Sequence, residues 1–199
     1  MDPKPFSAAS ERNREPILAV LRTHFADRRH VLEIGSGTGQ HAAYFAAQLP
    51  HLVWHASDRA GNLPGIRQWL DEAALPNTPA PLVLDVARGS WPRQAFDAMF
   101  SANTLHIMAW PEVEAMFAGL DAAASSDAKL AIYGPFNYHG RYTSASNAEF
   151  DRSLKAQAAH RGIREFDDVN RLAHGAGFEL IEDAAMPANN RCLVWQRRE

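Results

Sequence analysis

The sequence predicts a Rossmann-like α/β fold in which a mixed sheet of seven strands has helices on both faces. Short runs rich in Val, Ile, Leu and Phe alternate with longer stretches whose apolar residues recur at helical spacing. This alternation is typical of a parallel sheet covered on both faces by its crossover helices. Near the C-terminus, two strand-like runs follow each other without room for a crossover helix. They should therefore pair antiparallel, as a hairpin.

Each expected element follows from its own pattern. The parallel strands are expected at residues 31–34, 52–57, 81–85, 96–101 and 129–134. The hairpin strands are expected at residues 178–182 and 191–196, with Asn189 and Asn190 in the turn between them. The helices are expected at residues 16–25, 39–49, 64–74, 111–123 and 165–175. Pro16, Pro64 and Pro111 suit the first positions of three of these helices.

We expect a single domain over residues 1–199, because this length suits one hydrophobic core. Residues 1–15 are expected to form a lid-like segment over the site. Residues 135–162 interrupt the alternation after the fifth parallel strand, and the spacing of Phe150 and Leu154 indicates a helix there. Open sheets bind ligands beyond the carboxyl ends of their strands, so this insertion is predicted to lie on the substrate side. The alternative is an ordinary surface helix and loop.

Composition excludes several classes of function. The net charge is -3 and the pI is about 6.3, so neither a nucleic acid nor an anionic membrane is an expected partner. The polar start does not resemble a secretory signal, and Cys192 alone allows no internal disulfide and no cysteine metal site. We expect a cytoplasmic protein with Cys192 buried in a strand. His51 and His55 bracket a predicted strand, and no zinc-binding histidine spacing occurs, so no metal is expected.

A glycine-rich turn follows the first predicted strand and precedes a helix. Free N–H groups at such a helix start suit an anionic group, and glycine lets a ligand approach the backbone closely. The nicotinamide fingerprint G-x-G-x-x-G is not met, because Gln40 stands where the third glycine belongs. A short-chain oxidoreductase would also need Tyr-x-x-x-Lys, and none of the four tyrosines has a lysine four residues on. The turn therefore does not fit a nicotinamide oxidoreductase.

Residues 33–39 read E-x-G-x-G-x-G, which resembles motif I of the class I S-adenosylmethionine-dependent methyltransferases. The resemblance implies S-adenosyl-L-methionine as cofactor and S-adenosyl-L-homocysteine as product. It also implies that the predicted sheet is the seven-stranded class I methyltransferase sheet with its antiparallel C-terminal hairpin.

Polar residues at the ends of the next three strands occur in the order that this cofactor requires. Asp58 would accept hydrogen bonds from the ribose hydroxyls. Asp85 would accept one from the adenine amino group, and the Val86 N–H would donate to a ring nitrogen. Asn103 would lie near the methionine part, and Glu33 near the ammonium and sulfonium groups. The predicted cofactor contacts are Glu33, Gly35, Ser36, Gly37, Thr38, Gly39, Asp58, Asp85, Val86 and Asn103.

Nearly the whole chain resembles one branch of that superfamily, the methyltransferase-like 26 family. The matching segments are residues 10–13, 31–41, 103–110, 133–136, 143–147 and 187–190. The resemblance implies the methyltransferase fold and cofactor but names no substrate. Ser36 departs from it, because many relatives are expected to have alanine there.

Methyl transfer needs the acceptor atom, the methyl carbon and the sulfur in line, and a base helps where the acceptor carries a proton. His106, three residues after Asn103, is the predicted catalytic base, and a structural histidine is the alternative. Predicted substrate-side residues are Arg12, Asn13, Trp110, Tyr133, Asn137, Tyr138 and Arg141. The sequence thus predicts a methyltransferase with a small-molecule acceptor. The alternative is a protein that keeps the cofactor pocket but acts, without catalysis, through a partner.

Overall fold

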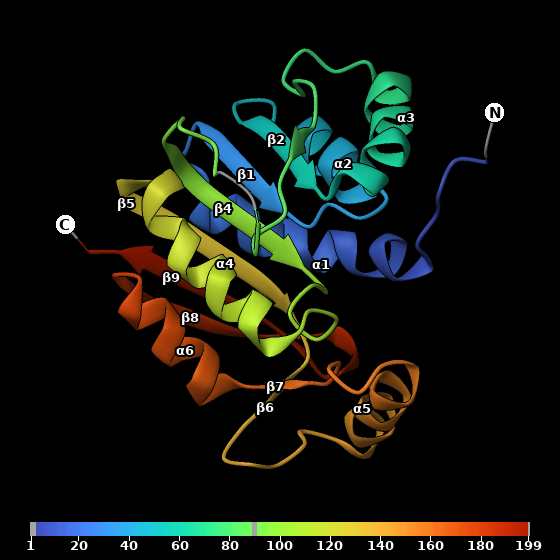
Figure 1. Ribbon diagram of the computed structural model, residues 1–199. Coiled ribbons are helices and arrows are strands. Elements are labelled where there is room, and N and C mark those ends of the chain that lie inside the picture. Colours follow the sequence, from blue (N-terminus) through green and yellow to red (C-terminus); the bar gives the residue numbers. More distant parts are fainter. Residues whose placement is uncertain (1–2, 89–90, 199) are drawn as a thin grey trace.

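The computed structural model describes residues 3–88 and 91–198, and its main sheet is the predicted one (Figure 1). The strand order is β3-β2-β1-β4-β5-β9-β8. The first five strands are mutually parallel, whereas β9 runs antiparallel to both β5 and β8. The strands are β1 (His30–Ile34), β2 (Val53–Asp58), β3 (Leu82–Val83), β4 (Phe96–Ala102), β5 (Ala124–Gly134), β8 (Phe178–Met186) and β9 (Asn190–Arg197). Their order confirms the predicted α/β fold with its C-terminal hairpin.

Helices cover both faces of the sheet. One face packs against α1 (Ala8–His24), α2 (Gln40–Gln48) and α3 (Leu63–Ala73), and the other against α4 (Trp110–Ala123) and α6 (Phe166–Gly175). Short 3-10 turns, η1 (Ala60–Asn62) and η2 (Pro187–Asn189), precede α3 and β9. In none of the described segments is a helix both long enough and apolar enough to cross a membrane.

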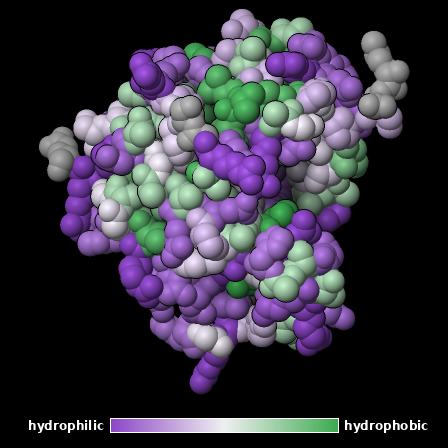
Figure 2. All heavy atoms as spheres, viewed as in Figure 1, coloured by the Kyte–Doolittle hydropathy of each residue, from purple (hydrophilic) through white to green (hydrophobic). Residues whose placement is uncertain are grey.

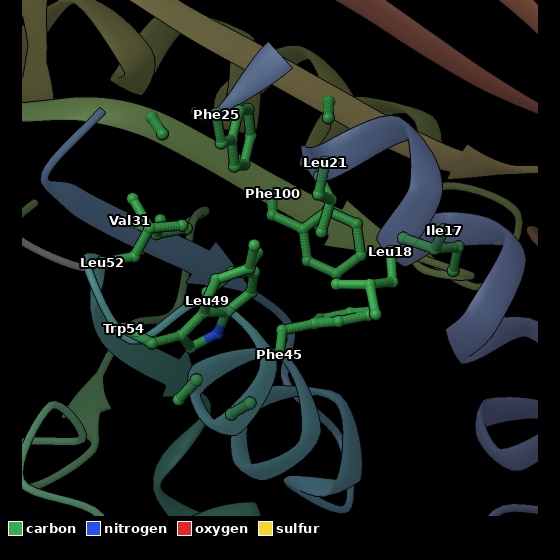
Figure 3. Packing of buried hydrophobic residues seen from close by; sticks show 14 of the residues in the cluster. Ile17, Leu18, Leu21, Phe25, Val31, Phe45, Leu49, Leu52, Trp54 and Phe100 are labelled. Atoms are coloured by element: carbon green, nitrogen blue, oxygen red, sulfur yellow. The ribbon is translucent and has the colours of Figure 1, made fainter. Parts of the chain in front are cut away.

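Three aromatic side chains form the centre of the core on the α1–α3 face (Figure 3). Phe45 of α2, Trp54 of β2 and Phe100 of β4 are each fully buried, with ring centroids 5.4 to 5.8 Å apart. Rings at this separation add specific contacts to the burial of their large apolar surfaces. Cys192 of β9 is also fully buried on this face, which confirms the predicted strand thiol.

Four predicted boundaries were wrong. β5 begins at Ala124 and not at residue 129, and β8 extends to Met186 and not only to residue 182. The first helix begins at Ala8 and not at Pro16, because the Ser7 side chain accepts a hydrogen bond from the Ser10 N–H and caps the helix there. Pro16 therefore lies inside α1. The third strand is shorter than expected, since only Leu82 and Val83 pair with the end of β2.

The predicted insertion, residues 135–162, lies beyond the carboxyl ends of β4 and β5, along the bottom and at the lower right of Figure 1. It contains the expected helix, α5 (Ala145–Gln157), which is capped by Ser144. It also contains β6 (Phe136–Asn137), which pairs in parallel with β7 (Arg164–Glu165) in a separate two-stranded sheet. Strands of two residues show no alternation, so the sequence pattern could not predict them.

Candidate functional site

The glycine turn joins the ends of β1 and β2. The N–H groups of Gly35 and Ser36 donate to the Ser57 carbonyl over 3.0 and 2.9 Å. In return, the Ser57 N–H donates to Ser36 Oγ over 3.0 Å. The Ser57 hydroxyl donates to the Glu33 carbonyl over 2.6 Å, so the turn is held on both sides. This network fixes the backbone before α2 begins.

Two glycines of the turn have different roles. Gly39 has φ +90°, and a Cβ there would lie 2.8 Å from the Ile66 Cα of α3, so it lets two helices pack closely. Gly37 has φ +58°, but a Cβ there would meet no heavy atom within 4 Å. The missing side chain at Gly37 therefore leaves open space above the turn.

Asp58, at the end of β2, has its carboxylate fixed beside that space. Its Oδ2 accepts from the Gly37 N–H over 2.7 Å. Its Oδ1 accepts from the Arg59 N–H over 2.7 Å and from Asn62 Nδ2 over 2.9 Å. These donors orient both oxygens, and the side chain still borders a cavity.

That cavity has a volume of about 810 Å³ and lies at the carboxyl ends of the parallel strands. Its size is typical of a site for a small organic molecule. Seven of the ten predicted cofactor contacts line it: Gly35, Ser36, Gly37, Thr38, Asp58, Val86 and Asn103. Asn103 has φ +57°, and its N–H donates to the Tyr133 carbonyl over 2.8 Å, which fixes the turn after β4.

Three predicted cofactor contacts do not line the cavity. Gly39 packs against α3 instead. The Glu33 side chain is buried on β1, where Oε2 accepts from Trp54 Nε1 over 3.0 Å, and burial raises the pKa of this carboxyl to about 7. Asp85 lies 3.7 Å from Arg59 Nε, so its contact is with a residue that borders the cavity.

His106, the predicted base, lines the cavity on the loop after β4. It is 6% exposed, and its ring centroid lies 5.4 Å from that of Phe150 in an edge-to-face arrangement. Burial, followed by the charges of Arg164 and Arg161, lowers the pKa of His106 to about 4. The imidazole is therefore neutral near pH 7.

None of the seven predicted substrate-side residues lines the cavity. Asn13 is buried, and its Oδ1 lies 2.7 Å from His41 Nε2, so it joins α1 to α2. Tyr133 packs in the core beneath α1, and the Tyr138 hydroxyl donates to Asp183 Oδ2 over 2.8 Å. The other four residues are Arg12 on α1, Trp110 at the start of α4, Asn137 on β6 and Arg141 after the Tyr138 turn. No residue between Glu112 and Phe150 lines the cavity, and four of the seven, Tyr133, Asn137, Tyr138 and Arg141, belong to this stretch.

Other residues that line the cavity were not named as site residues from the sequence, although most lie in the expected lid (residues 1–15) or in the predicted substrate-side insertion (residues 135–162). They come from the start of the chain, from the loop after β4 and from α5 with the loop that follows it: Ser7, Ala9, Ser10, Thr104, Ile107, Phe150, His160 and Arg161. Ser10, Thr104 and Ile107 lie in segments of the family resemblance, and the spacing of Phe150 indicated a helix rather than a site. Over residues 3–88 and 91–198, no three His, Cys, Asp or Glu side chains are arranged to hold a metal ion.

A family model described as "Protein of unknown function (DUF938)" matches residues 4–197. The chain belongs to the DUF938 family. The family description states no activity, so membership leaves the function open.

Solved methyltransferase structures share the fold of this DUF938 member. The apo form of the S-adenosylmethionine-dependent methyltransferase SibL is 22% identical with a TM-score of 0.82, over 96% of this chain and 56% of that chain. An O-methyltransferase family protein from Burkholderia thailandensis is 17% identical with a TM-score of 0.78, and the match covers 93% of this chain and 56% of that chain. PigF with SAH is 15% identical with a TM-score of 0.77, and the match covers 92% of this chain and 55% of that chain. The chain thus spans little more than half the length of these proteins, and the likeness establishes the fold.

Proposed function

We propose that this protein is an S-adenosylmethionine-dependent methyltransferase with a small-molecule acceptor. One observation carries the proposal: the open space above Gly37 and the fixed carboxylate of Asp58 border the same cavity. Seven predicted cofactor contacts gather there. The fold shared with S-adenosylmethionine-dependent methyltransferases, and the presence of SAH in the PigF structure, support this assignment.

The residues of the turn suit this cofactor. The space above Gly37 leaves room for an amino-acid portion, and Asp58 is placed to accept hydrogen bonds from hydroxyl groups. Val86 and Asn103 border the cavity from the ends of β3 and β4, where the adenine and methionine portions would lie. When bound, the cofactor supplies an electrophilic methyl group on a sulfonium.

The neutral imidazole of His106 would accept a hydrogen bond from the molecule to be methylated and so orient it. Its pKa of about 4 makes it a weak base near pH 7, since efficient general bases have pKa values close to the working pH. An acceptor that is already ionised, or that is acidic, needs no stronger base. This limits the role of His106 in the chemical step.

Other expectations remain part of the proposal. They are a single domain over residues 1–199, membership of the methyltransferase-like 26 branch, a cytoplasmic location and the absence of nucleic-acid and membrane partners. Residues 1–15 would act as a lid, and the positions of Ser7, Ala9 and Ser10 in the cavity wall support this role.

Calorimetry with S-adenosylmethionine, S-adenosylhomocysteine and NAD tests the cofactor. We expect the first two to bind and NAD not to bind. Binding of NAD alone would contradict the proposal. Transfer of a tritiated methyl group to members of a metabolite library then tests the activity.

Gly37→Ala, with Gly140→Ala as its matched control, tests the position of the site. Both glycines have positive φ, +58° and +72°, and a Cβ at either position meets no atom within 4 Å. Each substitution should therefore cost about 1–2 kcal/mol of stability through backbone strain. Only Gly37→Ala should weaken S-adenosylhomocysteine, by more than tenfold, because its methyl group enters the cavity. Equal affinity of the two variants would remove the turn from the site.

A further inference from the structure

The cavity has two ends with different chemistry. At the turn end lie its two carboxylates, Asp58 and Glu112, and the Glu112 carboxylate pairs with the Arg59 guanidinium. The far end is built by the loop after β4 and by residues 150–161. The two segments meet where the Gly162 N–H donates to the His106 carbonyl over 3.0 Å. Among the described residues that line the far end, none is acidic.

Arg161 brings a positive charge to this far end. Its Nη1 donates to the neutral Gln157 Oε1 over 2.8 Å, and its Nε is buried without a hydrogen-bond partner. Within residues 3–88 and 91–198, no carboxylate lies within 4.0 Å of the Arg161 guanidinium. A guanidinium has five donors, so most of its capacity to bind an anion is unused.

Arg164 adds to the positive potential there. Its guanidinium donates to the carbonyls of Leu105 and His160 over 3.0 Å each and also to that of Met108. Carbonyl groups are neutral, so they satisfy its donors without cancelling its charge. The nearby carboxylate of Asp151 already pairs with Lys155 over 2.6 Å.

Apolar side chains complete the far end. Hydrophilic residues cover most of the face in Figure 2, and hydrophobic residues form small separate groups. The described large hydrophobic side chains that are exposed are Phe6, Val83, Ile107, Tyr142, Phe150 and Ile181. Two of these, Ile107 and Phe150, line the cavity, with exposures of 43% and 40%. Exposed apolar residues inside a cavity indicate that the ligand has an apolar part.

We propose that the far end binds the methyl acceptor as a small organic anion, with its apolar body on Ile107 and Phe150 and its anionic group on Arg161. This inference depends on the proposed function, because it places acceptor and cofactor in one cavity. The planar guanidinium matches a carboxylate or a phosphate ester, both of which take two parallel hydrogen bonds from arginine. An uncharged acceptor of the same shape would leave that charge uncompensated.

Binding of matched ligand pairs tests the inference without measuring catalysis. Benzoate, 4-hydroxyphenylacetate and hexanoate are titrated in the calorimeter, each beside its neutral primary amide, with and without S-adenosylhomocysteine. Phenyl phosphate forms a separate arm, which distinguishes a phosphate ester from a carboxylate. We expect at least one of the anions to bind at least tenfold more tightly than its neutral counterpart, which for phenyl phosphate is phenol. Equal affinities of every anion and its neutral counterpart, or failure of every anion to bind at millimolar concentration, would overturn the inference.

Variants then assign the anion to its partner. Arg161→Ala should weaken anion binding at least tenfold, and Arg161→Lys should restore part of it, because the charge stays but the planar fork is lost. Arg152→Ala is the matched control, since Arg152 lies exposed on α5 and does not line the cavity. Phe150→Ala should weaken an acid and its amide equally. Unchanged anion affinity in Arg161→Ala would overturn the inference.

The same titrations separate the two proposals. Retained S-adenosylhomocysteine binding in Arg161→Ala, together with lost anion binding, supports both. If the wild-type protein does not bind S-adenosylhomocysteine, the proposed function fails, and the titrations without it still report whether Arg161 binds anions.

Discussion

Glu33 is a carboxyl whose ionisation is constrained by the fold. The residue is 2% exposed, and burial is the main cause that raises the pKa of its carboxyl from 4.5 to about 7. The charge of Asp58 adds to the rise, whereas hydrogen bonds with Trp54 and Ser36 oppose it. Near neutral pH the protein therefore holds this carboxyl partly protonated, at a cost to its stability.

Glu33→Gln should stabilise the protein at pH 8. The native pKa is raised, so the stability that the neutral carboxyl contributes is complete below pH 4.5 and is lost as the pH rises through about 7. Over this interval the loss is on the order of 3 kcal/mol, which a glutamine avoids. Urea denaturation without cofactor at pH 8 and pH 5 measures the effect. Exposed Glu149→Gln is the control and should change nothing, and equal stabilisation at both pH values would contradict the prediction.

At the scale of elements, the register of β1 against β4 depends on one carboxylate. Asp97 of β4 accepts from the Arg29 N–H over 2.8 Å and from the His30 N–H over 2.7 Å. The backbone pairing of the two strands starts at the next residues, Val31 and Ala98. Asp97 thus satisfies the two N–H groups just before that pairing begins.

Asp97→Ala should destabilise the protein by about 1–3 kcal/mol, because it removes the acceptor of two backbone donors. Asp121→Ala serves as the control. Asp121 is 73% exposed and pairs with Arg197 at the surface, so its loss should change stability by less than about 1 kcal/mol. Chemical denaturation compares the two variants. Equal effects would show that Asp97 does not hold the strands together.

At the scale of the whole molecule, two buried histidines change the pH dependence of stability in the direction opposite to that of Glu33. His41 and His106 both have pKa values lowered from 6.5 to about 4, mainly by burial. For both, the native pKa is depressed, so unfolding takes up protons and stability falls as the pH drops from 6.5 to 4. Glu33 acts in the opposite sense between pH 7 and 4.5. The two histidines together change the stability more than Glu33 does over this pH range. His55, whose pKa is also lowered, changes it in the same direction as the other two histidines.

We therefore expect a net loss of stability on the order of 2 kcal/mol between pH 7 and pH 4.5. The double variant H41Q/H106Q removes the larger contribution, so its stability should rise as the pH falls through this interval. Denaturation curves at several pH values measure both slopes. A fall of equal size in the double variant would show that other groups control the acid response.

Local sequence was sufficient where a residue's role depends on its neighbours along the chain. The turn at residues 35–39 and the parallel strands were predicted because glycines and apolar runs are local signals. The start of α1 was missed although Ser7 is a good cap, because Pro16 offered a competing signal. The residues proposed to hold the cofactor could be predicted for the same reason, since Asp58, Val86 and Asn103 each lie at or shortly after the end of a strand.

On the proposed acceptor side, the sequence predicted the segment, residues 135–162, but not the individual side chains. Arg161 and Phe150 reach the cavity because the chain, which leaves it after Glu112, returns to it over α5, and nothing in their spacing records that return. Tyr133 and Asn13 looked suitable by position, but the fold buries them in packing contacts. The sequence by itself determined the strands of the sheet, the antiparallel hairpin and the turn that faces the proposed cofactor. Tertiary structure decided which side chains face it across the cavity, because those contacts join segments whose meeting depends on the packing of the whole fold.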